Sequence, residues 1–141
     1  MTTPHNRSVK LDIASRYEML DMVQLVLAHM AGLLGLGEEA THYMTVAVRE
    51  SVVNAIKHGN RQDAAKRVEL EFQLHKDSLE ISVHDEGAGF DPDSVPNPLA
   101  EENLLKSYGR GIFFMRSFMD EVVYSFPPRG GTLVKMVKRH S

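Results

Sequence analysis

The chain has 141 residues, 43% of them hydrophobic, which is enough for one domain with a sizeable core and too short for two ordinary domains. Its basic and acidic residues are interspersed, and the formal net charge of −3 argues against direct binding to nucleic acid through a basic surface. It contains no cysteine and no apolar run of the roughly 20 residues that span a bilayer. We therefore expect a single domain over residues 1–141, located in the cytoplasm and without membrane attachment.

The first elements that the sequence predicts are a strand and a helix. Residues 8–13 alternate between polar and apolar side chains, which is typical of a strand with one buried face. Apolar residues then recur at helical spacing over residues 15–34, where Ser15 and Glu18 have the pattern of a capping box. The helix should end in the glycine-rich stretch that contains Gly32, Gly35 and Gly37.

A second helix is predicted from about residue 38 to residue 58. Small and apolar side chains form one continuous stripe along it, made by Met44, Ala47, Val48, Ser51, Val52 and Ala55. Gly59 follows the last periodic residue, and glycine just past the end is the usual stop of a helix.

Two alternating segments, residues 68–74 and 79–83, predict an antiparallel hairpin with a turn at Lys76 and Asp77. The stretch from residue 85 to about residue 109 is rich in glycine and proline and has no sustained periodicity. A loop of this length inside a small domain indicates a functional lid or a partly disordered segment.

The last third predicts a helix over residues 111–120 and a terminal hairpin of residues 122–126 and 132–137. The order of these elements indicates an α+β fold. We expect a two-layer sandwich in which three helices cover one face of a mixed, mostly antiparallel sheet.

Three polar residues share one flank of the second predicted helix. Glu50, Asn54 and His58 are spaced at i, i+4 and i+8, so they line one edge beside the apolar stripe. Asn54 would offer a neutral oxygen to a hard cation such as Mg²⁺, and Glu50 could act as a base one turn away. An ordinary amphipathic helix has the same pattern on its surface, so this helix alone identifies no function.

An acidic residue and two glycines follow the second strand of the hairpin. Asp85 stands at the strand end, where its side chain would be held rigidly and could accept a hydrogen bond from an exocyclic amine. Gly87 and Gly89 would let the backbone approach a flat base or a phosphate chain closely. An ordinary turn has the same composition.

Two further glycines, Gly109 and Gly111, stand at the start of the third predicted helix, where free backbone amides favour an anion such as phosphate. The dinucleotide fingerprint Gly-x-Gly-x-x-Gly is incomplete because position 114 is phenylalanine. A Walker P-loop is also absent from the sequence.

Taken together and in this order, the three elements resemble the motifs of the Bergerat (GHKL-type) ATPases, which include DNA gyrase, the histidine kinases and the MutL-like proteins. The N, G1 and G2 boxes are matched by Glu50-x-x-x-Asn54-Ala55-x-x-His58-Gly59, Asp85-x-Gly87-x-Gly89-Phe90 and Gly109-x-Gly111. Gly131-Thr132 resembles the short G3 element. Within this superfamily the chain is most similar to the anti-sigma factor serine kinases, which are free-standing domains of this length.

The resemblance implies that ATP is the ligand and that Mg²⁺ accompanies it. Asp85 would bind the adenine amino group with help from Thr132, while Gly87 and Gly89 would give the base and sugar close access to the backbone. Asn54 would ligate Mg²⁺ that bridges the phosphates. Glu50 would accept the proton of a serine or threonine hydroxyl as that oxygen attacks the γ-phosphate.

Other residues of the matched motifs would contact the nucleotide as well. Gly109, Arg110 and Gly111 would close over the phosphates as the hinge end of a lid over residues 92–108. Phe90 and Ile112 belong to the same boxes. Lys57 and His58 could contact phosphates, although a lysine at a helix C-terminus also has a structural reason to be there.

By resemblance, the partners would be a sigma factor of RNA polymerase and an anti-sigma antagonist of the STAS type, and the protein would form a homodimer. One alternative is a nucleotide-dependent binding module that transfers no phosphate, for which Glu50 would have no role. Another is the detached catalytic domain of a histidine kinase. Such an enzyme needs a dimerising helical hairpin, and only about 40 residues precede the second predicted helix.

Overall fold

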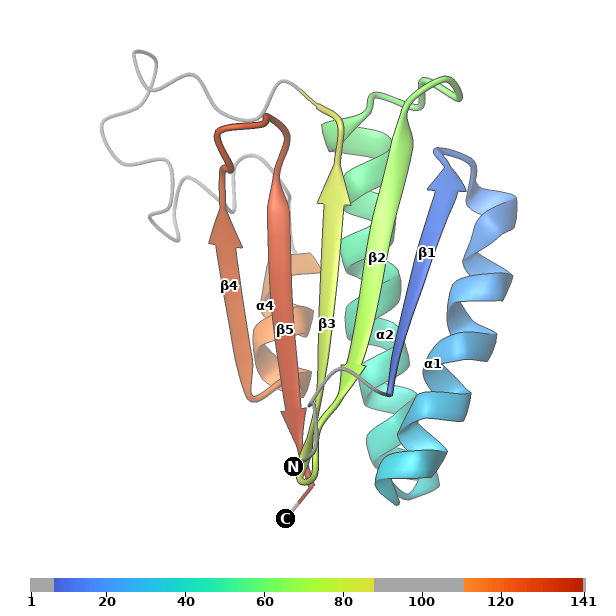
Figure 1. Ribbon diagram of the computed structural model, residues 1–141, viewed down its shortest axis with the longest axis vertical. Helices are drawn as coiled ribbons and strands as arrows, with labels where there is room; N and C mark the ends of the chain where they lie inside the picture. The colour runs from blue at the N-terminus through green and yellow to red at the C-terminus, as the bar shows by residue number, and fades with distance from the viewer. Residues whose placement is uncertain (1–6, 88–110, 141) are drawn as a thin grey trace.

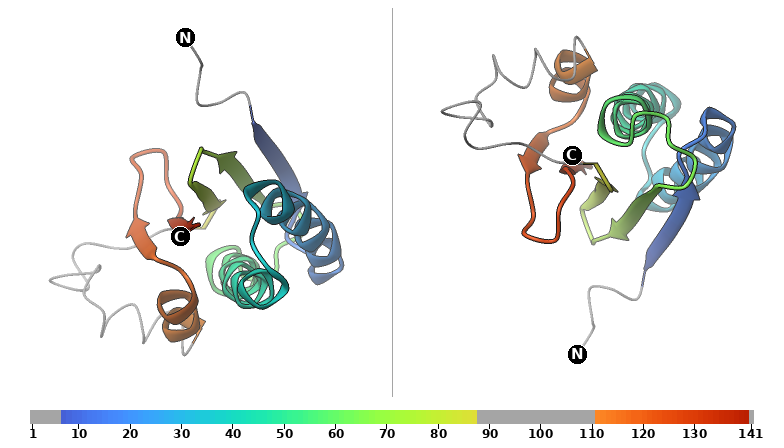
Figure 2. Two further views of the ribbon diagram at one scale, coloured as in Figure 1. Left: turned by 90° about the horizontal axis from the view of Figure 1, so that it is seen from below. Right: turned by 90° about the horizontal axis from the view of Figure 1, so that it is seen from above.

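The computed structural model describes residues 7–87 and 111–140, in which a five-stranded sheet carries helices on one of its faces (Figures 1 and 2). The strands are β1 (Ser8–Ala14), β2 (Arg67–Leu74), β3 (Ser78–Asp85), β4 (Glu121–Ser125) and β5 (Leu133–Arg139). The helices are the 3₁₀ turn η1 (Tyr17–Met19), α1 (Leu20–Leu34), α2 (Glu38–Asn54), the π-helical turn η2 (Ala55–Gly59) and α4 (Gly111–Phe118).

The strand order is β1-β2-β3-β5-β4, and each of the four pairings is antiparallel. The α+β class and the helical layer are confirmed, but the expectation of a mixed sheet is wrong for the described strands. Hairpins join β2 to β3 and β4 to β5, and β5 returns beside β3, so neighbouring strands run in opposite directions. The predicted lid over residues 92–108 lies outside the described residues.

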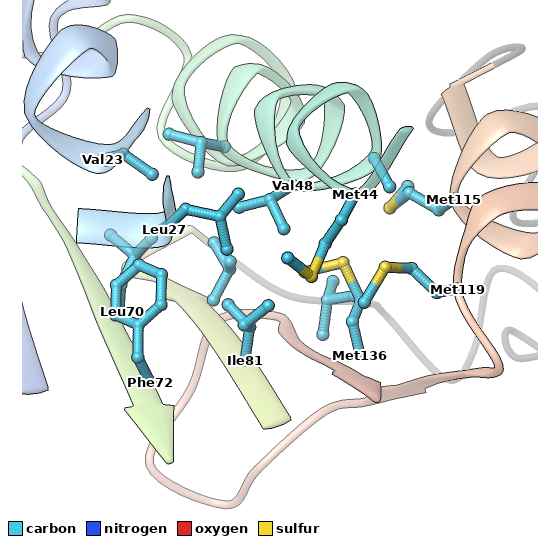
Figure 3. Packing of buried hydrophobic residues seen from close by; sticks show 14 of the residues in the cluster. Val23, Leu27, Met44, Val48, Leu70, Phe72, Ile81, Met115, Met119 and Met136 are labelled. Carbon is cyan, nitrogen blue, oxygen red and sulfur yellow. The ribbon is translucent and has the colours of Figure 1, made fainter. Parts of the chain in front are cut away.

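The core lies between the sheet and the helices, as the predicted alternation requires (Figure 3). Apolar residues of β2 and β3 that were expected to share one face are all buried. Figure 3 shows Leu27 of α1 near Leu70 and Phe72, and a group of methionines between α2, α4 and β5. These methionines are Met44, Met115, Met119 and Met136.

The start of the first helix differs from the prediction. Ser15 and Glu18 make no capping box, because α1 begins at Leu20 after the 3₁₀ turn and has no side-chain cap. The Ser15 hydroxyl instead donates to the carbonyl oxygen of Lys66 at 2.7 Å, which ties it to the start of β2. The predicted end is confirmed: Gly35 adopts a left-handed φ of 89° as the C-cap.

The part of the chain that the structure describes contains no helix long and apolar enough to cross a membrane.

The packing of α1 predicts a large effect for one leucine of this helix and almost none for another. Leu27 is fully buried, whereas Leu25 is 67% exposed. Leu27→Ala should lower the free energy of unfolding by about 2–5 kcal/mol, because it leaves a cavity in the core. Leu25→Ala should change it by less than about 0.5 kcal/mol. Urea denaturation measures both, and equal losses would contradict this placement of the helix.

Candidate nucleotide-binding site

Apart from the two that begin α4, the predicted site residues of the described ranges gather at one end of the molecule, where β3 ends, β5 begins and α2 passes into η2 (upper end of Figure 1). Asp85 is the last residue of β3 and Thr132 directly precedes β5. The two are bonded to each other, since the amide of Asp85 donates to the carbonyl oxygen of Thr132 at 3.1 Å. The antiparallel β3–β5 pairing thus brings the predicted G1 and G3 elements together.

Asp85 is only 3% exposed, and backbone amides hold its carboxylate. Its Oδ1 accepts hydrogen bonds from the amide of Gly87 at 2.9 Å and from the amide of Thr132 at 3.1 Å. Because both amides bond to Oδ1, Oδ2 is the oxygen left to accept a hydrogen bond from a ligand. A carboxylate fixed in this way is well suited to recognise an amine.

Two glycines surround this carboxylate at very short range. A Cβ added to Gly59 would come within 2.1 Å of Asp85 Oδ2, and one added to Gly87 would come within 2.3 Å of the carbonyl oxygen of Gly59. The predicted end of the helix at Gly59 is confirmed, because Gly59 is the last residue of η2, which continues α2; its φ, however, is not left-handed. It is needed as glycine because the end of α2 and the end of β3 touch there.

Burial raises the pKa of Asp85 above the usual range of a carboxyl group. The hydrogen bonds from Gly87 and Thr132 oppose this shift, as do the nearby His84 and Lys66, but they do not cancel it. The protein therefore keeps an ionisable group in an environment that disfavours its charge, which is a common feature of binding and catalytic sites.

The polar flank of α2 is partly buried at the same end of the helix. Asn54 is 7% exposed, and among the described residues its Nδ2 has no hydrogen-bond partner. The hydroxyl of Ser51, one turn earlier, also lacks one there, and Glu50 is half-buried. A buried amide with an open donor is costly unless a ligand or water completes it. The open Nδ2 donor of Asn54 therefore fits a role toward an acceptor such as a phosphate oxygen.

Lys57 and His58 lie in η2 and are exposed. The π-helical turn is wider than an α-helical turn, so the i, i+4 spacing that joins Glu50 to Asn54 is not continued regularly to His58. Partial burial lowers the pKa of His58, and the charge of Lys57 lowers it further.

Several predicted site residues have no described surroundings. Gly89, Phe90, Gly109 and Arg110 lie outside the described residues. Gly111 and Ile112 begin α4, and only their backbone is described.

Two residues at this end of the sheet were missed by the sequence analysis. Asn60 is fully buried, and its Oδ1 accepts a hydrogen bond from the amide of Glu86 at 2.8 Å. The ring Nε2 of His84 lies 2.8 Å from the carbonyl oxygen of Gly130, which anchors the turn before Thr132. An asparagine after a glycine has the pattern of an ordinary turn, and a histidine within a strand has no special signal, so neither stood out.

The helix-free face of the sheet holds a shallow depression of about 460 Å³, which is a different place from the Asp85 site. Charged residues on this face pair across the strands, with Lys10 and Glu71 at 3.7 Å and Lys135 and Glu80 at 3.2 Å. Such exposed pairs contribute little to stability. Their mutual pairing indicates an ordinary solvated sheet face.

The fold and this arrangement agree with a comparison to protein families. The model of the histidine kinase-like ATPase domain matches residues 13–138. The chain therefore belongs to this family, and within it to the anti-sigma factor serine kinases, as its relatives show.

The anti-sigma F factor of Oceanobacillus iheyensis is 37% identical over 106 residues, which cover 74% of this chain and 72% of that protein. The serine-protein kinase RsbW of Listeria innocua is 27% identical over 128 residues, 86% of this chain and 81% of that protein. RsbW of Bacillus subtilis is 28% identical over 120 residues, which cover 81% of this chain and 75% of that protein. Their similarity supports an anti-sigma kinase-like function.

Solved structures share the fold. The crystal structure of the RsbU and RsbW domains of Rv1364c from Mycobacterium tuberculosis matches with a TM-score of 0.68 at 16% identity, over 95% of this chain and 32% of that chain. The crystal structure of the SiaB-SiaC complex from Pseudomonas aeruginosa contains a chain that matches with a TM-score of 0.65 at 11% identity. The match covers 92% of this chain and 88% of that chain. At these identities the likeness concerns the fold alone.

The raised pKa of Asp85 predicts a pH-dependent difference between the wild type and Asp85→Asn. An acid whose pKa is higher in the folded state contributes stability that is fully present below its unfolded value, here near 3.8, and is lost as the pH rises through the folded value. The asparagine variant keeps an oxygen for both amides and carries no charge. Its free energy of unfolding relative to wild type should therefore increase from about pH 4 to about pH 7.

Urea denaturation of both proteins across this pH range measures the difference. A difference that stays constant, or that shrinks as the pH rises, would show that burial does not disfavour the charge of Asp85.

Proposed function

We propose that this chain binds ATP at the Asp85 site, transfers its γ-phosphoryl group to a serine or threonine of a STAS-type anti-sigma antagonist, and sequesters a sigma factor. The observation that carries the proposal is the buried Asp85 carboxylate, held by two backbone amides beside a glycine of the predicted N box. The family of ATPase domains and the names of the relatives support it.

Adenine recognition follows from the chemistry of Asp85. The exocyclic amine of adenine is a hydrogen-bond donor, and a rigid carboxylate oxygen is the matching acceptor. A base with a carbonyl oxygen in that position would face this carboxylate with a second acceptor and would be rejected. The missing Cβ at Gly59 and Gly87 keeps the backbone close to the carboxylate, so little room is lost to side chains.

The α2 flank would serve the phosphate end of the nucleotide. Asn54 is the residue whose side-chain oxygen would hold Mg²⁺, and its open Nδ2 donor would suit a phosphate oxygen. Bound Mg²⁺ would neutralise charge on the phosphates. Glu50, half-buried one turn before Asn54, would accept the proton of the attacking hydroxyl. We assign Gly111 and the other G2 residues to the phosphate side by their motif.

The protein partners are proposed from the relatives. An anti-sigma F factor at 37% identity supports a sigma factor as the sequestered partner, and the serine-protein kinases support a serine or threonine as the phosphoryl acceptor. A homodimer is part of the same proposal.

ATP binding should depend on the charge and geometry of Asp85. Asp85→Asn replaces an acceptor oxygen by a donor nitrogen and should weaken Mg-ATP binding by at least about tenfold, because a buried donor would face the adenine amine. Calorimetric titration with Mg-ATP measures it. Asp21→Asn, the same change in the exposed first turn of α1, is the matched control and should leave the affinity unchanged. Equal affinity of Asp85→Asn and wild type would refute the adenine assignment.

Phosphoryl transfer should depend on Glu50 while ATP binding does not. Glu50→Gln removes the base and should lower the transfer rate by about 10²–10⁴-fold with little change in Mg-ATP affinity. Glu39→Gln, an exposed position at the start of the same helix, should behave like wild type. Radiolabelled ATP and the STAS-domain antagonists of the same organism provide the assay.

The outcomes separate the kinase from its alternatives. Unchanged transfer by Glu50→Gln would exclude the base role. ATP binding without transfer to any of these antagonists would favour a binding module, and an acid-labile phosphate on the chain itself would favour a histidine kinase.

A further inference from the structure

Asn60 stands at the point where α2 and η2 end, and its side chain is bonded in three directions. Nδ2 donates to Ser15 Oγ at 2.7 Å and to the carbonyl oxygen of Arg67 at 2.9 Å, while Oδ1 accepts from the amide of Glu86 at 2.8 Å. The residue is 0% exposed. One amide group thus joins the loop after β1, the start of β2 and the residue directly after β3.

All hydrogen-bonding groups of this side-chain amide have partners except one lone pair of its oxygen. Removing such a group from a buried position deprives each partner of its bond to Asn60, and each loss is costly in a place that water cannot easily enter. The three contacts therefore define one arrangement of the segments they join.

The neighbours of Asn60 connect it to the candidate site. Gly59 precedes it and approaches Asp85 Oδ2 so closely that no Cβ fits between them. Glu86, whose amide Asn60 holds, follows Asp85 directly, and the side chain of Glu86 accepts a hydrogen bond from the amide of Arg67 at 2.8 Å. The bond from Glu86 to Asn60 spans the same gap, between the end of α2 and the end of β3, that Gly59 and Asp85 span.

The backbone around Asn60 is unusual in a way that requires such support. Its amide donates to Ala55 at 2.8 Å and so closes the π-helical turn, and the next two residues, Arg61 and Gln62, both have left-handed φ values of 52° and 59°. Residues other than glycine adopt this region at a cost, and they persist there when surrounding contacts hold them.

We propose that Asn60 is a positioning residue that sets the separation of Gly59 from Asp85 and thereby the adenine specificity of the site. The inference rests on the proposed function, because it assigns Asp85 to the adenine amine. With the Asn60–Glu86 bond intact, the carboxylate stays in the plane where it accepts from an exocyclic amine. Without it, the end of β3 moves away from Gly59, and the site loses its preference for an amine over a carbonyl oxygen.

The experiment compares the affinities for Mg-ATP and for Mg-ITP, since inosine carries a carbonyl oxygen in place of the adenine amine. Calorimetric titration gives the ratio of the two affinities for wild type, Asn60→Ala and Ser15→Ala. Wild type should prefer ATP by at least about tenfold. Asn60→Ala should bring the ratio below about threefold, because it removes the bond to Glu86.

Ser15→Ala is the matched control. It breaks the opposite end of the same buried network, at Ser15 Oγ, and leaves the Asn60–Glu86 bond in place. It should lower the unfolding midpoint, as Asn60→Ala does, and keep the ATP/ITP ratio within about twofold of wild type. If Asn60→Ala does not fold, Asn60→Ser replaces it, because a serine hydroxyl is too short to reach Glu86.

The results distinguish this inference from the proposed function. If wild type binds ATP and ITP equally or binds neither, the adenine assignment itself fails, and the inference fails with it. If wild type prefers ATP and the Asn60 variant keeps that preference, only the positioning role is wrong. An equal loss of preference in Ser15→Ala would also overturn it, because general destabilisation would then explain both.

Discussion

The structure depends on one buried carboxylate, which lies where the end of β3 meets both the turn after α2 and the residue before β5. Oδ1 of Asp85 accepts hydrogen bonds from the amides of Gly87 and Thr132, and Oδ2 packs against Gly59. Burial disfavours the charge of this group, so a folded chain that keeps it sacrifices stability at neutral pH. A destabilising buried acid of this kind is typical of a site that recognises a ligand. This contact brings parts of the predicted N, G1 and G3 elements, which are far apart in the sequence, to one place.

The rest of the fold supplies rigid supports for this contact. Antiparallel pairing of β3 with β5 places Thr132 beside Asp85, and the apolar stripe of α2 presses that helix onto the sheet so that its C-terminal end reaches the end of β3. The π-helical turn and the buried amide of Asn60 complete the approach. On the sheet face without helices, charged residues pair with one another across the strands.

Much of this could be predicted from local patterns. Period-two alternation identified β2 and β3 with the correct inward residues, and helical spacing identified α1, α2 and their buried faces. The predictions failed where contacts between residues far apart in the sequence determine the role of a side chain. Ser15 has the spacing of a cap, yet its hydroxyl bonds to Lys66. The helix does end at Gly59, but the neighbouring carboxylate that leaves no room for a Cβ there has no local signal. Asn60 gave no signal, because its three partners lie in segments that only folding brings together.

The most direct test of the account is a crystal structure of the chain with Mg-ADP. The account predicts the exocyclic amine of adenine within hydrogen-bonding distance of Asp85 Oδ2 and the phosphates near Asn54, with the contact of Gly59 and Asp85 preserved. Adenine bound elsewhere, for example in the depression on the helix-free face of the sheet, would contradict it. So would a nucleotide in this site whose base does not touch Asp85.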